Sequence, residues 1–217
     1  MTPAAPDPLT TPDTSVSGVV WDLGNVVVDW QPLHAVAAGV GEEEARRFLA
    51  ADDFDFGAYN HGPDSGMSWD EAEARVAASH PHWLEHCRAY RRHFPASLVG
   101  PVPGTSEIIE ALAAAGVPQW GLTNWSDELY HAHAPRMFPV LGLLREVVVS
   151  GTEGLAKPDR EIYDLTRERT GLPASSLVFV DDKQVNVDAA LDAGWRGLVF
   201  TDADVLRGGL RGLGLPV

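Results

Sequence analysis

Residues 18–29, with the sequence GVVWDLGNVVVD, decide the fold. The apolar residues at the start of this stretch run directly into Asp22, and a second apolar run, VVV, follows two residues after Gly24. A short, continuous apolar run beside glycine is typical of a strand that is buried on both faces, as in a parallel sheet. We therefore predict that the ordered part of the chain begins at Gly18 with a buried parallel strand.

Further apolar segments alternate with helical patterns along the chain. The strand-like segments cover residues 118–123, 146–150, 177–180 and, more weakly, 197–200. The helix-like patterns cover residues 105–115, 159–170 and 186–193, and each is followed by glycine, which commonly ends a helix. This alternation indicates βαβ units. The predicted fold is therefore α/β, with a doubly wound, parallel, Rossmann-like sheet.

Residues 32–99 interrupt the alternation. Helix-like patterns here cover residues 42–50, 68–79 and 82–94, and a polar segment that contains glycine, residues 59–66, separates the first two. We expect a small helical cap domain at residues 32–99, inserted after the first strand and placed over the carboxyl ends of the sheet. The α/β core domain would then consist of residues 18–31 and 100–217.

The first 17 residues differ in composition from the rest of the chain. Residues 1–17 are rich in Pro, Thr and Asp and show neither helical nor strand periodicity. We predict that they form a flexible leader. At the other end, residues 207–217 (RGGLRGLGLPV) are rich in glycine, and we assign no element to them.

Composition excludes several kinds of partner. The 217 residues include 16 Lys and Arg against 31 Asp and Glu, so the formal net charge is −15. Nucleic acids and anionic membranes bind through Lys and Arg, so neither partner is expected. The single cysteine, Cys87, excludes an intrachain disulfide and a cysteine-based zinc cluster. We expect a cytoplasmic monomer or homodimer that binds a small molecule.

Polar residues follow the predicted core strands, at the edge where open α/β sheets bind ligands. They are Asp22 after the first strand, Thr123 and Asn124 after the next, Lys157 in the loop after the third, and Asp181 and Asp182 after the fourth. Carboxylates that face one another need a cation between them, and their oxygens suit Mg²⁺. A lysine, a hydroxyl and an amide supply donors for an anion. Together these groups predict a phosphoryl-transfer site.

Each of these groups also has an ordinary structural explanation. An Asp or a Thr-Asn pair after a strand commonly forms a turn or caps a helix, and a single Lys is usually solvated. The pair Asp181-Asp182 could cap the helix that we predict at residues 186–193. The functional interpretation rests on finding all of these groups, in this order, at successive strand ends.

In their order along the chain, the segments WDLGNVVVD, LTN, KPD and VFVDD resemble the four motifs of the haloacid dehalogenase superfamily, over residues 18–201. The insertion at residues 32–99 resembles the type-one helical cap of that superfamily. The forms DLGNVVVDW and TNWS are similar to the branch that contains bacterial alpha-glucose-1-phosphatase-like enzymes.

The resemblance implies a metal site at the first and fourth motifs. Asp22 would be the nucleophile that becomes an aspartyl-phosphate, and its other carboxylate oxygen would bind Mg²⁺. The backbone carbonyl of Gly24 would be a second ligand. Asp182 matches the acidic metal-binding position, with Asp181 beside it as a further ligand or a support.

The same resemblance implies groups that hold the substrate. Thr123 and the backbone of Asn124 would bind the transferring phosphoryl group, and Lys157 would neutralise Asp22 and a phosphate oxygen. Trp30 and Trp125 each follow a motif closely, and we expect them to wall the pocket.

One position departs from the family pattern. Most phosphatases of the superfamily carry a second Asp two residues after the nucleophile, where it acts as general acid and then as general base. Here that position is Gly24, which cannot carry a proton. Water, a cap residue or a leaving group that needs little help must replace this function, and we expect a slow or narrow phosphatase.

Three functions remain open. The leading one is a Mg²⁺-dependent phosphatase that acts on a small phosphorylated metabolite, with sugar phosphates as one candidate class. A 2-haloacid dehalogenase would use Asp22 to displace halide from carbon, but that branch works without a metal and has little reason to keep Asp181 and Asp182. A catalytically weak binding protein on the same scaffold would explain Gly24 but not the presence of both Asp22 and Lys157.

Overall fold

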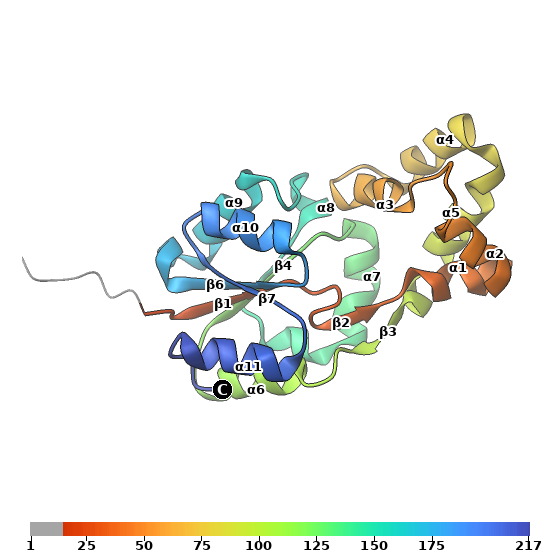
Figure 1. Ribbon diagram of the computed structural model, residues 1–217. Helices are drawn as coiled ribbons and strands as arrows, with labels where there is room; N and C mark the ends of the chain where they lie inside the picture. Colours follow the sequence, from red (N-terminus) through yellow and green to blue (C-terminus); the bar gives the residue numbers. More distant parts are fainter. Residues whose placement is uncertain (1–14) are drawn as a thin grey trace, which may run out of the picture.

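The computed structural model describes residues 15–217 and contains a five-stranded parallel sheet with helices on both faces (Figure 1). The strand order is β5-β4-β1-β6-β7, and every neighbouring pair is parallel. The strands are β1 (Gly18–Trp21), β4 (Gln119–Thr123), β5 (Val147–Val149), β6 (Leu177–Asp181) and β7 (Arg196–Val199). The predicted α/β, doubly wound fold is confirmed.

Strand β1 lies at the centre because its side chains are apolar on both faces. Val19 and Trp21 pack into one layer of the core, and Val20 packs into the other. The first layer is covered by α6 (Thr105–Ala114), α7 (Asp127–Met137) and α11 (Ala203–Gly212), and the second by α9 (Arg160–Thr170) and α10 (Gln184–Asp192). The chain therefore leaves β1 and β6 toward opposite faces, which makes their carboxyl ends a switch point of the sheet.

Residues 32–99 form a group of helices beyond the carboxyl ends of the strands, on the right in Figure 1. We call these residues the helical insertion. Its helices are α1 (Pro32–Val40), α2 (Glu42–Leu49), α3 (Phe56–Asp64), α4 (Trp69–Ser79) and α5 (Leu84–Arg92), with 3₁₀ turns η1 (Pro81–Trp83) and η2 (Phe94–Ser97). None of the residues 32–99 adds a strand to the five-stranded sheet.

A short ribbon joins the helical insertion to the core. Strand β2 (Val28–Trp30) pairs antiparallel with β3 (Leu98–Pro101). Between β1 and β2, the amides of Val27 and Val28 donate to the Leu23 carbonyl at 2.9 and 2.8 Å and close a tight turn. This turn places Gly24 and its neighbours at the edge of the site.

Several elements differ from the sequence-based expectations. The polar segment 59–66 lies largely within α3, because the Asp55 carboxylate caps this helix by accepting from the Ala58 amide at 2.9 Å. The glycine-rich tail contributes to α11, whose N-terminus is capped by Asp202 and whose Leu210 is completely buried. The sequence patterns do not predict α1 and α7, which the structure contains.

Residues 1–14 of the predicted leader lie outside the described residues. Val16 is buried, and the Ser17 amide donates to the Ser176 carbonyl at 2.8 Å, so the packed chain starts slightly before the predicted position Gly18. Within residues 15–217, none of the helices is both long enough and apolar enough to cross a membrane.

The remaining helical segments complete the connections of the core. They are α8 (Ser150–Glu153), which directly follows β5, and the 3₁₀ turns η3 (Pro139–Leu143) and η4 (Ala174–Ser176). Helix α8 contacts α3, so the core and the helical insertion meet there as well as at the ribbon.

Candidate active site

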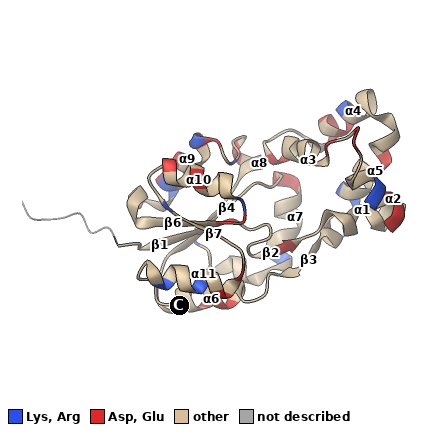
Figure 2. Ribbon diagram, viewed as in Figure 1, with Lys and Arg blue, Asp and Glu red and all other residues tan. Residues whose placement is uncertain are grey.

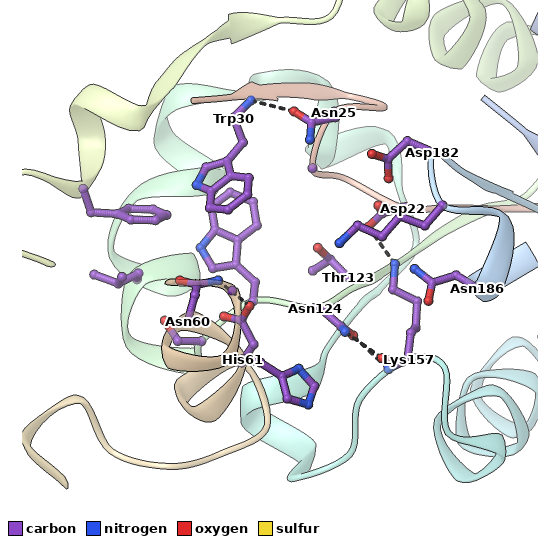
Figure 3. Close-up of a pocket in the computed structure, with 18 of the residues that line it drawn as sticks. Asp22, Asn25, Trp30, Asn60, His61, Thr123, Asn124, Lys157, Asp182 and Asn186 are labelled. Atoms are coloured by element: carbon purple, nitrogen blue, oxygen red, sulfur yellow. Dashed lines mark hydrogen bonds and ion pairs between the residues drawn. The ribbon is translucent and has the colours of Figure 1, made fainter. Parts of the chain in front are cut away.

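The carboxyl ends of β1, β4 and β6 open into a pocket with a volume of about 300 Å³ (Figure 3). The structure brings most of the predicted site residues to the wall of this pocket: Asp22, Gly24, Trp30, Thr123, Asn124, Trp125, Lys157 and Asp182. The remaining predicted residue, Asp181, is completely buried beside Lys157. In Figure 3, Asp22, Asp182 and Lys157 lie on one side of the pocket and Trp30 and Asn60 on the other.

Lys157 connects the first and fourth motifs. Its Nζ atom lies 2.8 Å from Asp22 Oδ1 and 2.7 Å from Asp181 Oδ2, and it donates to the Leu122 carbonyl at 3.0 Å. Burial would lower the pKa of Lys157, but the two carboxylates outweigh this effect and raise it above its usual value. The buried ammonium is therefore charged and held on three acceptors.

Asp22 follows directly after β1 and is 7% exposed. Its Oδ1 atom accepts a hydrogen bond from the Leu23 amide at 2.7 Å and is the same oxygen that contacts Lys157. Oδ2 is therefore the oxygen left to attack a substrate. Burial raises the pKa of Asp22 to about 7 against the opposing effect of Lys157.

The acidic residues of the site could hold a cation. Carboxylate oxygens of Asp22, Asp181 and Asp182 all lie within 4.8 Å of one another. Burial and the neighbouring Asp181 also raise the pKa of Asp182. One ammonium cannot balance three carboxylates, so a divalent cation fits the charge and the oxygen donors of this cluster.

Within this cluster, Asp181 has a supporting geometry. Its oxygens accept from Lys157 Nζ, from Asn186 Nδ2 at 3.1 and 3.0 Å, and from the Lys183 amide at 2.8 Å. These donors occupy both oxygens. Asp22 and Asp182 line the pocket and are the better placed carboxylates for direct coordination, with the Gly24 carbonyl as a further candidate.

The Asn124 side chain holds the loop that carries Lys157. Asn124 Oδ1 accepts from the Lys157 amide, and Asn124 Nδ2 donates to the Lys157 carbonyl, both at 2.9 Å. The side-chain amide of Asn124 therefore positions Lys157 and is not free to bind a ligand. Thr123 itself ends β4, is 1% exposed and lines the pocket.

The helical insertion supplies the opposite wall, which the sequence motifs did not reveal. Asn60, His61 and Asp64 from α3 line this side. Asp64 is 7% exposed, and its Oδ2 atom accepts from Asn60 Nδ2 at 2.8 Å. Burial raises the pKa of Asp64 to about 7, while a hydrogen bond from the Ser126 backbone and the charges of Lys183 and Lys157 oppose that rise.

Aromatic side chains complete this wall. They are far apart in the sequence, so their spacing does not predict that they meet at one pocket. Trp69, Tyr90 and Phe94 come from α4, α5 and η2 and lie beside Trp30 and Trp125 at the pocket. The Trp69 indole donates from Nε1 to Ser126 Oγ at 3.1 Å and so links the insertion to the loop after β4. One local signal in the sequence does point to this wall. Asp55 is a typical helix N-cap residue, and a helix predicted from it would have included Asp64.

Two characterised proteins are similar in sequence to this chain. A sesquiterpene phosphatase of Aspergillus oryzae, AstK, is 24% identical over 191 residues, which cover 88% of this chain and 92% of the relative. The flavin mononucleotide hydrolase 1 of Arabidopsis thaliana is 29% identical over 114 residues, which cover 52% of this chain and 46% of the relative.

Solved structures share the fold at low identity. A HAD-like family hydrolase of Porphyromonas gingivalis is 18% identical, with a TM-score of 0.68 and coverage of 92% of this chain and 98% of its own. A HAD family enzyme of Bacteroides thetaiotaomicron, in complex with magnesium and inorganic phosphate, is 17% identical, with a TM-score of 0.63 and coverage of 86% and 95%. An L-2-haloacid dehalogenase of Xanthobacter autotrophicus is 16% identical, with a TM-score of 0.57 and coverage of 91% and 83%.

The family match agrees with this geometry. Residues 16–194 match the haloacid dehalogenase-like hydrolases. This span includes β1, the helical insertion, the strand ends at Asp22, Thr123 and Asp182, and the loop that carries Lys157. The predicted resemblance is confirmed, and this chain belongs to the haloacid dehalogenase-like hydrolase family.

Proposed function

We propose that the protein is a Mg²⁺-dependent phosphatase that hydrolyses the phosphate ester of a small metabolite through an aspartyl-phosphate on Asp22. The observation that carries this proposal is the fixed Asp22 carboxylate, whose Oδ1 is held by Lys157 and the Leu23 amide while Asp182 stands beside it. The phosphatase and hydrolase names of the two sequence relatives support the same reaction class.

The residues present fit a magnesium ion. Asp22, Asp182 and the Gly24 carbonyl would hold it at the pocket wall. When bound, the ion would offset the repulsion between the carboxylates and a phosphate dianion. The magnesium and phosphate complex of the Bacteroides enzyme supports this assignment by analogy of fold.

The proposed reaction has two displacements. Asp22 Oδ2 attacks phosphorus, the ester P–O bond breaks, and the leaving oxygen takes a proton from water. A second water then attacks phosphorus and gives its proton to the hydroxide left by the first water, the P–O bond to Asp22 breaks, and inorganic phosphate is released with the carboxylate restored. Lys157 remains protonated throughout and stabilises charge on the phosphoryl oxygens together with Thr123 and the Asn124 backbone.

Gly24 limits how the leaving group can be protonated. An Asp at this position would donate a proton to the leaving oxygen, but Gly24 has no side chain, and an added Cβ would meet no atom within 4 Å. Space is therefore available there for a water molecule. We expect slow turnover of esters whose leaving alcohol is a weak acid.

We also propose that the helical insertion acts as a cap domain whose movement admits substrate. It faces the carboxyl ends of the strands and is joined to the core through the β2 and β3 ribbon (Figure 1). Asp64 and Trp69 contact the loop after β4, through Ser126, and would separate from it when the pocket opens.

A direct assay distinguishes phosphatase from dehalogenase. The purified chain is given p-nitrophenyl phosphate or 2-chloropropionate, each with Mg²⁺ and with excess EDTA. We expect phosphate release that needs Mg²⁺ and disappears in the Asp22→Asn variant, with no halide release. Halide release that persists in EDTA would instead identify a dehalogenase.

A further inference from the structure

The half of the pocket that faces the leaving group has a nearly continuous aromatic wall. Ring centroids lie 5.9 Å apart for Trp69 and Tyr90, 5.6 Å for Tyr90 and Phe94, and 5.8 Å for Phe94 and Trp125. Each of these residues is at most 8% exposed, so their positions are fixed by packing. Trp30 and Leu129 extend the same wall. We call these six residues the aromatic wall.

The positive charges of the pocket are all at its other end. Two Lys residues line the pocket, Lys157 and Lys183. Lys157 contacts Asp22, and Lys183 directly follows Asp182 in the sequence, so both lie at the carboxylate cluster. Helix α3 carries no Lys or Arg, as Figure 2 shows, and no Arg lines the pocket among the described residues. A second phosphate or a carboxylate on the leaving group would therefore lack a cationic partner.

Asp64 is the acidic residue on the insertion side of the pocket, and it already has donors. Asn60 Nδ2 and the Ser126 backbone donate to its carboxyl group. Burial raises the pKa of Asp64 to about 7, so near neutral pH the side chain is in part uncharged. Asp64 is therefore not expected to select a positively charged leaving group.

The volume restricts the size of the leaving group. The cavity of about 300 Å³ is at the small end of the usual range for ligand pockets, and the phosphoryl group occupies part of it. Polar sugar hydroxyls placed against the aromatic wall would lose hydrogen bonds to water and find few free partners. Asn60 already donates to Asp64, and the Trp69 indole donates to Ser126. The buried Trp125 Nε1 is a donor of this wall that lacks a partner within the described residues.

Building on the phosphatase function proposed above, we propose that the substrate is the phosphate monoester of a compact, uncharged and mainly apolar alcohol, whose hydrocarbon part packs on the aromatic wall. Removal of that apolar surface from water supplies the binding energy. Sugar phosphates and bisphosphates would be poor substrates of the same site.

The test compares four phosphate esters in the presence of Mg²⁺: benzyl phosphate, glucose 6-phosphate, choline phosphate and glycerol 3-phosphate. Benzyl alcohol is a weaker acid than a sugar hydroxyl, so leaving-group chemistry works against the expected order. We expect kcat/KM for benzyl phosphate to exceed that for glucose 6-phosphate by at least about tenfold. A preference for glucose 6-phosphate or for choline phosphate would overturn the proposal.

Two variants test whether the aromatic wall causes the preference for benzyl phosphate. Trp30→Ala removes a partly buried residue of the aromatic wall, and Phe54→Ala removes a partly buried ring of the helical insertion that does not line the pocket. We expect Trp30→Ala to lower kcat/KM for benzyl phosphate about tenfold with little change for glycerol 3-phosphate, and Phe54→Ala to leave the ratio of the two unchanged. An unchanged ratio in Trp30→Ala would contradict the assignment.

Binding of a non-hydrolysable analogue keeps this inference apart from the proposed function. Benzylphosphonate and methylphosphonate are titrated into the wild-type protein with Mg²⁺, and binding is followed by calorimetry. Benzylphosphonate that binds about tenfold or more tightly than methylphosphonate would support the aromatic wall as the binding surface, even if the protein hydrolyses no ester. A lack of hydrolysis in that case would contradict only the proposed phosphatase function. Equal binding of the two, beside normal phosphatase activity, would overturn only the substrate class.

Discussion

Lys157 Nζ lies 2.8 Å from Asp22 Oδ1 and 2.7 Å from Asp181 Oδ2, so a single buried ammonium joins the carboxyl ends of β1 and β6. These strands are neighbours in the sheet and send their chains to opposite faces. The proposed nucleophile and its counter-charge are thus held by the central part of the core, while the residues expected to choose the substrate belong to the helical insertion.

Replacing Lys157 with Met should lower both the catalytic rate and the stability of the fold. The variant leaves Asp22 and Asp181 buried without their shared cation, and breaking a buried ion pair commonly costs about 3–5 kcal/mol. We expect kcat to fall at least about a thousandfold and the urea midpoint to decrease. Arg136→Met, on the exposed surface of α7, is the control and should change neither quantity. Retained turnover in Lys157→Met would show that the ammonium has no part in the reaction.

Replacing Asp182 with Asn should weaken metal binding more than folding. Asp182 contributes a carboxylate to the acidic cluster and is only partly buried, so its amide should fit the same space. We expect the Mg²⁺ concentration for half-maximal activity to rise by about tenfold or more, with recovery at high Mg²⁺. Asp188→Asn, on the exposed part of α10, is the matched control. An unchanged Mg²⁺ requirement would exclude Asp182 from the metal site.

Replacing Asn124 with Ala should lower kcat through the position of Lys157. The substitution removes both hydrogen bonds to the Lys157 backbone but keeps the Asn124 backbone, which is the part of this residue proposed to bind the phosphoryl group. We expect kcat to decrease about 10- to 100-fold with a much smaller change in KM. A large rise in KM with normal kcat would indicate that the Asn124 side chain binds substrate directly.

Replacing Asp64 with Asn should change how stability depends on pH. Burial raises the pKa of Asp64 from 3.8 to about 7, so the folded state binds its proton more tightly than the unfolded state does. The wild type therefore loses stability through this group as the pH rises from about 4 to 7, whereas Asn has no proton to lose. Between pH 5 and pH 8, we expect the free energy of unfolding of Asp64→Asn to gain about 2 kcal/mol relative to wild type, measured by urea unfolding. Parallel pH profiles would show that Asp64 has an ordinary pKa in the folded protein.

The strand ends could be predicted because each carries a local signal. A parallel strand such as β6, LVFVD, is apolar along its whole length, and the charged residues after it must lie at the edge of the sheet. The order of these ends along the chain then indicated that Asp22, Lys157 and Asp182 meet. The geometry of Asn124 was not predictable, because nothing local shows that its amide binds the backbone of a residue on another loop.

The insertion side of the site could be predicted only in part, for a different reason. Helix α3 contains Gly57, Gly62 and Pro63, which disfavour a helix, and it forms because Asp55 caps it and Tyr59 packs into the core. Tertiary contacts therefore outweigh local propensity here. The aromatic wall is assembled from elements that are distant in sequence, so no spacing rule brings its rings together.

The most direct test of Asp22 as the nucleophile is to identify the residue that carries the phosphoryl group during turnover. Wild-type protein with Mg²⁺ and a ³²P-labelled phosphate ester is quenched in acid during the first turnover, digested and analysed by mass spectrometry. We expect a hydroxylamine-sensitive acyl phosphate on the peptide that contains Asp22, and we expect this label to be absent in Asp22→Asn. The kcat of that variant should fall at least about a thousandfold while its thermal midpoint is unchanged or raised. Label on another residue, or wild-type turnover in Asp22→Asn, would contradict the assignment of Asp22 as the nucleophile.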